Sequence, residues 1–328
     1  MMGLRDKRFL WASIFALAGT MFYGQYGHAE EGGAGHYLPG SMASFMDTVP
    51  LGPTFVARLN VVNYSAQMDR GVPLPIAGQS VVDVNVDSRA YGLSLVWRPR
   101  WGSFGDKWSY AMSTTIPFVD MSIEGDINVA TQNGSANVFR ADTNSGLGDI
   151  VLMPVMLNYN ANSDLNYTAR LGLYAPTGDF EVGQLANTGK NYWTIEPTVS
   201  VNYFGQKNGR EAQLFFGMDF NQENSKTHYK SGTQAHLDGT LAQHFPMFKG
   251  LVGVGVTAYW YKQLAADSGE GATFGDFKGE VQGVGPVLSY TQKLSSGDII
   301  SEFKWVSEFG AHRRFEGDTL FLKVMMKY

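Results

Sequence analysis

The sequence has no cysteine among its 328 residues, which rules out disulfides, thiolate metal sites and cysteine redox chemistry. It also has no excess of positive charge: 25 Lys and Arg stand against 30 Asp and Glu, for a formal net charge of −5. A nucleic-acid partner requires a basic surface, so we expect none.

Long apolar runs are scarce as well, and the only one lies at the start. Three basic residues precede the apolar stretch 9–22 (FLWASIFALAGTMF), and the small-residue site Gly27-His28-Ala29 follows it. The stretch is too short to cross a bilayer comfortably and has the layout of a signal peptide. We therefore expect a signal peptide over residues 1–29 and an exported protein that begins at Glu30; an uncleaved anchor helix is the alternative.

Alternation of apolar and polar residues is abundant and runs from Leu51 to the last residue. In residues 192–203 (YWTIEPTVSVNY), every second residue from Trp193 lies on one largely apolar face, while Thr, Glu, Ser and Asn occupy the other. Such a period of two indicates β-strands, and no stretch has a helical period. Twelve strands are predicted, beginning near Pro53, Gln79, Lys107, Gly148, Asp164, Asn191, Arg210, Tyr229, Gly250, Phe277, Gly297 and Asp318.

The predicted connections alternate in length. The short ones are residues 99–106, 161–163, 205–209, 246–250 and 294–297, and the longer ones are 67–78, 121–147, 176–190, 222–228, 265–276 and 311–317. Outer-membrane barrels have short periplasmic turns and longer external loops. The expected fold is therefore all-β: a transmembrane antiparallel up-and-down β-barrel of about twelve strands over residues 51–328, with an exported β-sandwich as the alternative.

Aromatic residues and the final strand support a location in the bacterial outer membrane. Trp97, Trp108, Tyr203 and Tyr328 fall near the predicted periplasmic rim, and Trp193, Trp260, Trp305 and Phe309 near the outer rim. Belts of this kind form where a protein crosses a membrane interface. Residues 318–328 (DTLFLKVMMKY) also end on an aromatic behind a wholly apolar row, which is similar to the signal for outer-membrane barrel assembly. We expect the apolar rows to contact lipid and Tyr328 to be read by the assembly machinery.

The polar rows are expected to face the lumen. The candidate lining residues are Arg58, Asn60, Asp83, Asn85, Asp87, Arg170, Tyr174, Glu196, Phe215, Asp219, His236, Asp238, Tyr259, Tyr261, Glu302, Lys304 and Lys323. Both charge signs occur, so we expect ion pairs across the lumen, because an unpaired buried charge is costly. The four aromatic members suit a path for small hydrophobic or aromatic solutes, or they fill space; the sequence leaves both possibilities open.

Catalysis and metal binding receive little support from the sequence, although twelve-stranded outer-membrane phospholipases exist. His228 and Ser231 are three residues apart, which places them on opposite faces of a strand and not within reach of each other. His236, Asp238 and His244 share one face of one strand and make a poor metal site. No catalytic residue, metal or cofactor is expected, and a lipid hydrolase remains the less favoured alternative.

Five short motifs occur in order along the chain: EEGGAGHYLPGS after the predicted signal peptide, GLGD at 146–149, YAPTGDF at 174–180, NSKTHYKSG at 224–232 and VGPVLSY at 284–290. With these motifs the chain resembles the phenol meta-pathway degradation family of outer-membrane proteins. The resemblance implies a channel for passive uptake of aromatic or other hydrophobic compounds, linked to aromatic (phenol) catabolism. It brings no catalytic residues, and a structural or adhesive barrel without transport is the alternative.

The segment from Glu30 to Pro50 has no strand pattern but contains a Pro-Gly bend at Pro39. We expect it to fold into the barrel as a plug, with His36, Tyr37 and Pro39 at a constriction. A flexible periplasmic tail is the alternative.

Overall fold

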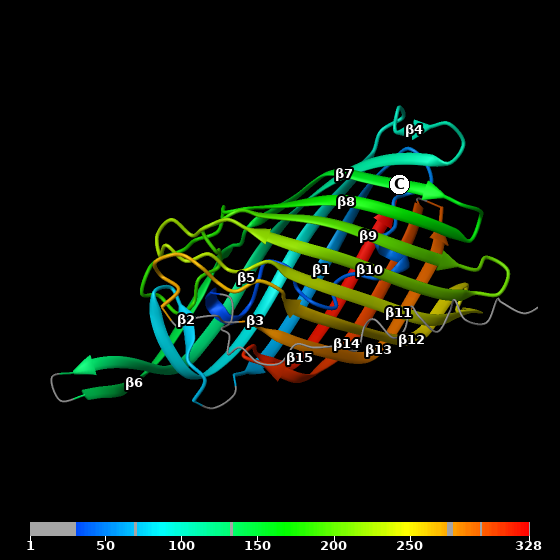
Figure 1. Cartoon of the computed structure of the whole chain (residues 1–328). Helices are drawn as coiled ribbons and strands as arrows, with labels where there is room; N and C mark the ends of the chain where they lie inside the picture. The colour runs from blue at the N-terminus through cyan, green and yellow to red at the C-terminus, as the bar shows by residue number, and fades with distance from the viewer. Residues whose placement is uncertain (1–30, 69–70, 132–133, 274–277, 296, 328) are drawn as a thin grey trace, which may run out of the picture.

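The structure, a computed structural model, describes residues 31–68, 71–131, 134–273, 278–295 and 297–327. The predicted signal peptide and Tyr328 lie outside these residues. Twelve long antiparallel strands close into a barrel, because β1 pairs with both β3 and β15, and β3 pairs with β5 (Figure 1). The barrel strands are β1 (Thr54–Gln67), β3 (Gln79–Arg98), β5 (Trp108–Thr131), β7 (Ile150–Asn160), β8 (Leu165–Ala175), β9 (Thr194–Phe204), β10 (Arg210–Asn221), β11 (Gln234–Met247), β12 (Gly250–Gln263), β13 (Glu280–Leu294), β14 (Gly297–His312) and β15 (Glu316–Lys327).

Three further strands and two short 3₁₀ helices complete the described fold. They are β2 (Leu74–Ile76), β4 (Ser103–Phe104), β6 (Gly134–Leu147), η1 (Glu31–Gly33) and η2 (Phe45–Asp47). None of the described residues belongs to a helix of the length and apolarity that a bilayer crossing requires.

The predicted loop 121–147 is wrong. Strand β5 continues to Thr131 and pairs along its second half with β6, so the two project beyond the barrel as a long hairpin (Figure 1). Ser122, Glu124 and Asp126 share one face of this part of β5, while Ile123 on the other face is buried in an apolar cluster with Ile127 packed against it. The predicted strand start at Tyr229 is also early, since β11 begins at Gln234.

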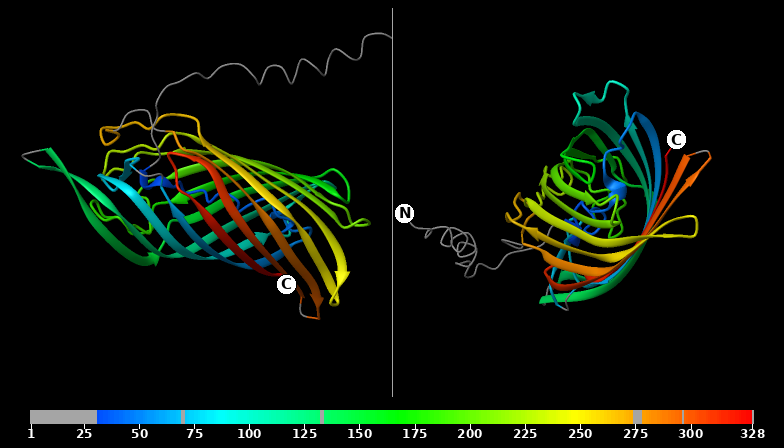
Figure 2. Two further views of the ribbon diagram at one scale, coloured as in Figure 1. Left: turned by 90° about the horizontal axis from the view of Figure 1, so that it is seen from below. Right: turned by 90° about the vertical axis from the view of Figure 1, so that its right-hand side faces the viewer.

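The alternation of connection lengths is confirmed. Links 99–107, 161–164, 205–209, 248–249 and 295–296 join strands at one end, and most of the links at the opposite end are longer. Two further views show the resulting tilted, twisted cylinder (Figure 2). By the topology of outer-membrane barrels, the short turns mark the periplasmic end and the longer links the external end.

The outer face of the barrel is apolar and exposed, whereas its inner face is polar and buried. Leu93, Val199, Leu241, Val254 and Leu288 point outward and are exposed, as a surface in contact with lipid requires. Aromatic rings gather at the periplasmic end, where Trp97, Trp101 and Tyr110 form successive ring contacts and Trp108 packs on Tyr159. Trp193 and Trp305 are exposed toward the external end. The fold is that of an outer-membrane β-barrel.

Candidate functional site: the barrel lumen

Most predicted lining residues lie on the inner face and are buried. The buried ones are Arg170, Tyr174, Glu196, Phe215, Asp219, His236, Asp238, Tyr259, Tyr261, Glu302, Lys304 and Lys323. Arg58 and Asn60 are partly buried and point the same way. The lumen is thus filled to a large extent, and what fills it comes from the start of the chain.

Asp83, and with it Asn85 and Asp87, is exposed and does not line the lumen. A bulge in the β3–β5 pairing lies between Val82 and Asn85, and Asp83 has a φ of 53° there. Asn85 and Asp87 follow the bulge and share the outward face of the exposed Tyr91 and Leu93, while Val84 and Val86 face inward and pack in an apolar cluster. Alternation alone does not tell which row faces inward, and polar residues are tolerated outside because this end of β3 extends past the lipid.

Residues 31–50, here called the inner segment, run through the lumen from its external end to its periplasmic end. At the external end, Glu31 accepts a hydrogen bond from Asn224 at 3.0 Å, and its backbone N–H donates to Ser231 at 3.2 Å. At the periplasmic end, the carbonyl of Pro50 accepts a hydrogen bond from Arg98 at 2.5 Å. The segment therefore passes along the whole barrel before β1 begins.

His36 is held between two walls. Its ring nitrogens lie 2.7 Å from the Thr194 hydroxyl and 2.8 Å from Asp149 Oδ2. The ring also stacks on Tyr174 with centroids 5.0 Å apart. Asp149 in turn accepts hydrogen bonds from the backbone N–H groups of Gly178 and Lys190, so it ties the YAPTGDF loop to the inner segment.

Tyr37 lies at mid-barrel. Its hydroxyl donates to Asp238 Oδ2 at 2.5 Å, and its ring stacks on His236 with centroids 3.5 Å apart. Burial and the neighbouring Asp238 carboxylate both raise the pKa of the Tyr37 hydroxyl, which therefore stays protonated and a donor. The bend that follows has Pro39 buried and Gly40 at a φ of 81°, as the Pro-Gly pair predicts.

Asp47 is the charged anchor of the inner segment. Its carboxylate lies 2.7 Å from Arg58 on β1 and 3.0 Å from Lys323 on β15. The Asp47 carbonyl also accepts a hydrogen bond from Arg170 on β8. Burial alone would raise the pKa of Asp47, but Lys323 and Arg58, followed by Lys304 and Arg170, hold that pKa well below the usual carboxyl range. The carboxylate is thus charged across the neutral and mildly acid range.

Further bonds join wall cations to the backbone of the inner segment. Lys304 donates to the carbonyl of Met42 at 2.7 Å, and Lys190 donates to the carbonyl of Ala34. A carboxylate on the wall also takes part: Glu211 accepts from the Phe45 N–H at 3.0 Å. Charged wall groups therefore pair with Asp47 or bond to the backbone of the inner segment, whereas ion pairs from wall to wall across the lumen were expected.

A cavity of about 330 Å³ remains beside the inner segment. His36, Tyr37 and Met42 form one side, and Tyr174 and Phe321 lie among the wall residues. Of the predicted aromatic lining residues, Tyr174 faces this cavity, whereas Phe215, Tyr259 and Tyr261 are buried in a packed cluster with Tyr37. Mixed aromatic, apolar and polar walls of this kind suit a small, weakly polar molecule.

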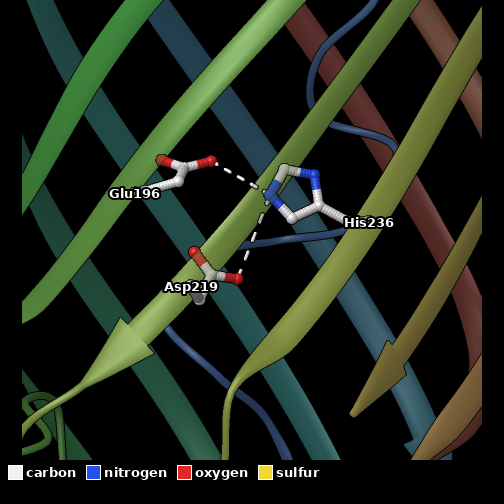
Figure 3. A group of neighbouring side chains, drawn as sticks. All are labelled: Glu196, Asp219 and His236. Carbon is white, nitrogen blue, oxygen red and sulfur yellow. Dashed lines mark ion pairs between the residues drawn. The ribbon is translucent and has the colours of Figure 1, made fainter. Parts of the chain in front are cut away.

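A second group of side chains meets on β9, β10 and β11. Figure 3 shows Glu196, Asp219 and His236 pointing toward one another from these three strands. His236 Nε2 lies 3.2 Å from Glu196 Oε1 and 3.9 Å from Asp219 Oδ2, and all three side chains are buried. His244, which shares the inward face of the same strand, has a different partner and pairs with Glu211 at 2.7 Å.

His228 and Ser231 make contacts with different partners. The ring of His228 is exposed and lies 3.2 Å from Glu223 Oε1. Ser231 is buried, and its hydroxyl accepts the hydrogen bond from the Glu31 N–H. The hydroxyl of Ser231 serves to hold the inner segment.

Two important residues were not predicted from the sequence. Asp47 carried a signal, because it is the only carboxylate between Glu31 and Met68 in a segment expected to enter a lumen with lysines and arginines. Asp149 lies inside the GLGD motif, which entered the sequence analysis only as one of the motifs of the family resemblance.

Comparisons with known proteins agree with this geometry. The family model described as "Putative MetA-pathway of phenol degradation" matches residues 73–324. No curated protein matches the sequence significantly. Among solved structures, the COG4313 outer membrane channel from Pseudomonas putida F1 is 15% identical and has a TM-score of 0.65, over 89% of this chain and 100% of that one. The β domain of the Bordetella autotransporter BrkA is 11% identical with a TM-score of 0.44, over 84% of this chain and 100% of its own.

The first of these structures shares the barrel fold with this chain. The family match covers most of the barrel, from the link before β2 into β15. The chain belongs to the MetA-pathway phenol-degradation family.

Proposed function

We propose that the protein is an outer-membrane channel for passive uptake of small hydrophobic or aromatic compounds, and that the inner segment is the plug that restricts it. The observation that carries this proposal is the cavity of about 330 Å³ between the inner segment and the wall. That volume is at the lower end of the range for small-molecule sites, and His36, Tyr37 and Tyr174 give it aromatic sides with hydrogen-bonding groups. The family description, which refers to phenol degradation, supports the same class of solute.

The proposed path follows the inner segment. A solute would enter from the external end and occupy the cavity beside His36 and Tyr174. It would leave when the inner segment shifts, so that Tyr37 separates from Asp238 and Asp47 separates from its two cations. No covalent step or cofactor is needed, since diffusion down a gradient supplies the driving force. As in other outer-membrane barrels, lipid contacts the apolar outer face; we propose in addition that Tyr328 is read by the barrel-assembly machinery.

Removal of the inner segment tests the plug. A variant lacking residues 31–48 is expected to show a larger single-channel conductance in planar bilayers than the full mature chain, because the lumen loses its filling. A variant that shortens the external hairpin of β5 and β6 is the matched control and should leave conductance unchanged. Equal conductance of the deletion and the parent would reject the plug.

Solute flux tests the channel itself. Proteoliposomes that contain the mature chain should take up radiolabelled phenol-like aromatics faster than empty liposomes and faster than they take up a sugar of similar size. A structural or adhesive barrel would give the uptake of empty liposomes for each of these solutes, with or without the inner segment.

A further inference from the structure

We propose that Glu196, Asp219 and His236 form a binding site for one divalent transition-metal ion, of which Zn²⁺ fits best. This inference does not depend on the channel function. It rests on a group of three side chains that come from three adjacent strands and are fully enclosed by protein.

The donor atoms have the chemistry and approximate spacing that zinc requires. Zinc is bound by imidazole nitrogen and carboxylate oxygen at about 2.0–2.2 Å, so donors of a tetrahedral site lie about 3.3–3.5 Å apart. His236 Nε2 and Glu196 Oε1 are 3.2 Å apart, and Asp219 Oδ2 lies 3.9 Å from the same nitrogen. A rotation of Asp219 that brings its oxygen closer by about 0.5 Å would complete the set.

The wall is shaped so that these side chains can meet. Gly217 is paired with His236 across β10 and β11, and a Cβ at position 217 would lie 2.4 Å from His236 Nε2. A Cβ at Gly172 would likewise lie 2.8 Å from Glu196 Oε2. Glycine at both positions therefore leaves the space into which the imidazole and the carboxylate extend.

The charges and hydrogen bonds of the group also favour a cation. Two carboxylates lie together in a buried place, and like charges so enclosed repel each other strongly unless a cation or proton compensates. Across the described part of the chain, neither ring nitrogen of His236 has a hydrogen-bond partner, although the side chain is completely buried. Its Nε2 is directed at the two carboxylates (Figure 3).

Neighbouring residues orient the donors as outer partners of metal ligands do. Tyr174 donates its hydroxyl proton to Glu196 Oε2 at 2.9 Å, which leaves Oε1 directed at His236. Tyr37 covers the face of the His236 ring. Glu196, Tyr174 and Tyr37 also border the cavity beside the inner segment, which gives an ion a route from the lumen.

Cobalt titration tests the site. The mature barrel, purified in detergent and stripped with a chelator, should bind one Co²⁺ per chain with a visible absorption band that added Zn²⁺ removes. His236→Gln and Glu196→Gln should each abolish the band, and Tyr174→Phe should weaken binding by about 10–100-fold. His244→Gln is the matched control, because His244 is also a buried lumen histidine paired with a carboxylate, and it should bind as the parent does.

The outcomes separate cleanly when each variant is first shown to be folded by its heat-dependent mobility on gels. No Co²⁺ band in the parent overturns the proposal, and so does a band that persists in His236→Gln. If one of the two glutamine variants fails to fold, the other decides. Loss of the band in His244→Gln would place the metal elsewhere and likewise contradict the site.

Discussion

The barrel interior is held together in two different ways in two regions. The inner segment packs Tyr37 and Ala43 against apolar wall residues but is also attached by charges and hydrogen bonds, above all through Asp47, Tyr37 and His36. The external links are instead joined by an apolar cluster, here called the loop cluster, which consists of Ala66, Met68, Leu74, Ile76, Ala77, Val81, Val84, Val86, Ile123, Leu185 and Phe315.

This difference indicates which part of the interior can detach when the pH or the salt concentration changes. Apolar contacts depend on buried area and have no charge state, so the loop cluster should be stable over a wide range of pH and salt. Charged contacts depend on protonation and on the presence of both partners. The inner segment is therefore the part that one substitution or a change of pH can detach, while the loops above it stay in place.

The largest expected effect comes from Asp47→Ala. Removal of one partner from a buried ion pair costs about 3–5 kcal/mol, here because Arg58 and Lys323 lose their shared carboxylate. Detachment of the inner segment should become about 100- to 4000-fold easier, since each 1.4 kcal/mol is tenfold. The chain has no cysteine, so the labelling rate of a single Ser41→Cys reports this directly.

Asp120→Ala is the control for that substitution, because Asp120 is exposed on the outside of the barrel. It should leave the labelling of position 41 at the parent rate. If Asp47→Ala also labels at the parent rate at position 41, the ion pairs of Asp47 do not hold the inner segment.

Leu74→Ala addresses the other side of the comparison. Leu74 is completely buried in the loop cluster, and truncation of such a leucine costs about 2–5 kcal/mol. We expect a lower midpoint of thermal unfolding with unchanged labelling at position 41. Leu241→Ala, on the lipid-facing side, serves as control and should change the midpoint much less; increased labelling in Leu74→Ala would show that the two regions are coupled.

Tyr37→Phe should have a smaller effect on the inner segment. It removes the donor to Asp238 Oδ2 and leaves the Met42 N–H at 3.3 Å as a remaining partner. An under-satisfied buried acceptor costs about 1–3 kcal/mol, so labelling of position 41 should rise by about tenfold. Tyr290→Phe, which removes a hydroxyl bonded to Phe248 at a periplasmic turn, should have no effect on this rate.

The smallest expected effect is a pH dependence at the external end of the inner segment. Burial raises the pKa of Glu31, against hydrogen bonds from Asn224 and Thr227 and the charge of Lys190. A carboxyl whose pKa is raised on docking favours docking when protonated, so attachment here should be strongest in acid and weaken as the pH rises through that raised pKa. Asp47 has the opposite sign: its contribution is complete above the ordinary carboxyl pKa and is lost only as the pH falls through its lowered pKa.

Spin labels separate the two ends. A nitroxide at Ala34→Cys should become more mobile as the pH rises from mildly acid to neutral, whereas one at Ser41→Cys should not change over that range. Glu31→Gln should abolish the pH dependence at position 34. A pH-dependent label at position 41 with a constant one at position 34 would contradict the assignment.

The sequence predicted the barrel because each strand has one face toward lipid and one toward the lumen. This requirement produces an alternation of apolar and polar residues that can be read within a single segment. Tyr259 and Tyr261 on β12 were correctly placed inside for this reason. Asp83 was placed wrongly because the polar row was taken to face inward, whereas at this end of β3 the apolar row with Val84 and Val86 packs inside. The hairpin of β5 and β6 was missed because it projects beyond the barrel, where apolar and polar rows do not report lipid and lumen.

The contacts within the lumen could not be predicted from local sequence patterns. Glu196, Asp219 and His236 were each predicted to face inward, but their meeting depends on the register of three strands and on the space left by Gly217. Asp149 and His36 are 113 residues apart, and nothing in either neighbourhood identifies the other. Such pairs follow from barrel closure and not from the composition of a segment.

Asp47 has one consequence for the order in which the molecule is assembled. Its two cations stand on the first and the last strand, Arg58 on β1 and Lys323 on β15, which are joined at the closing seam. The inner segment thus cannot acquire both cations until β15 has arrived beside β1. Docking of the inner segment therefore requires a closed barrel, and the lumen of an unclosed folding intermediate is not yet filled by this segment.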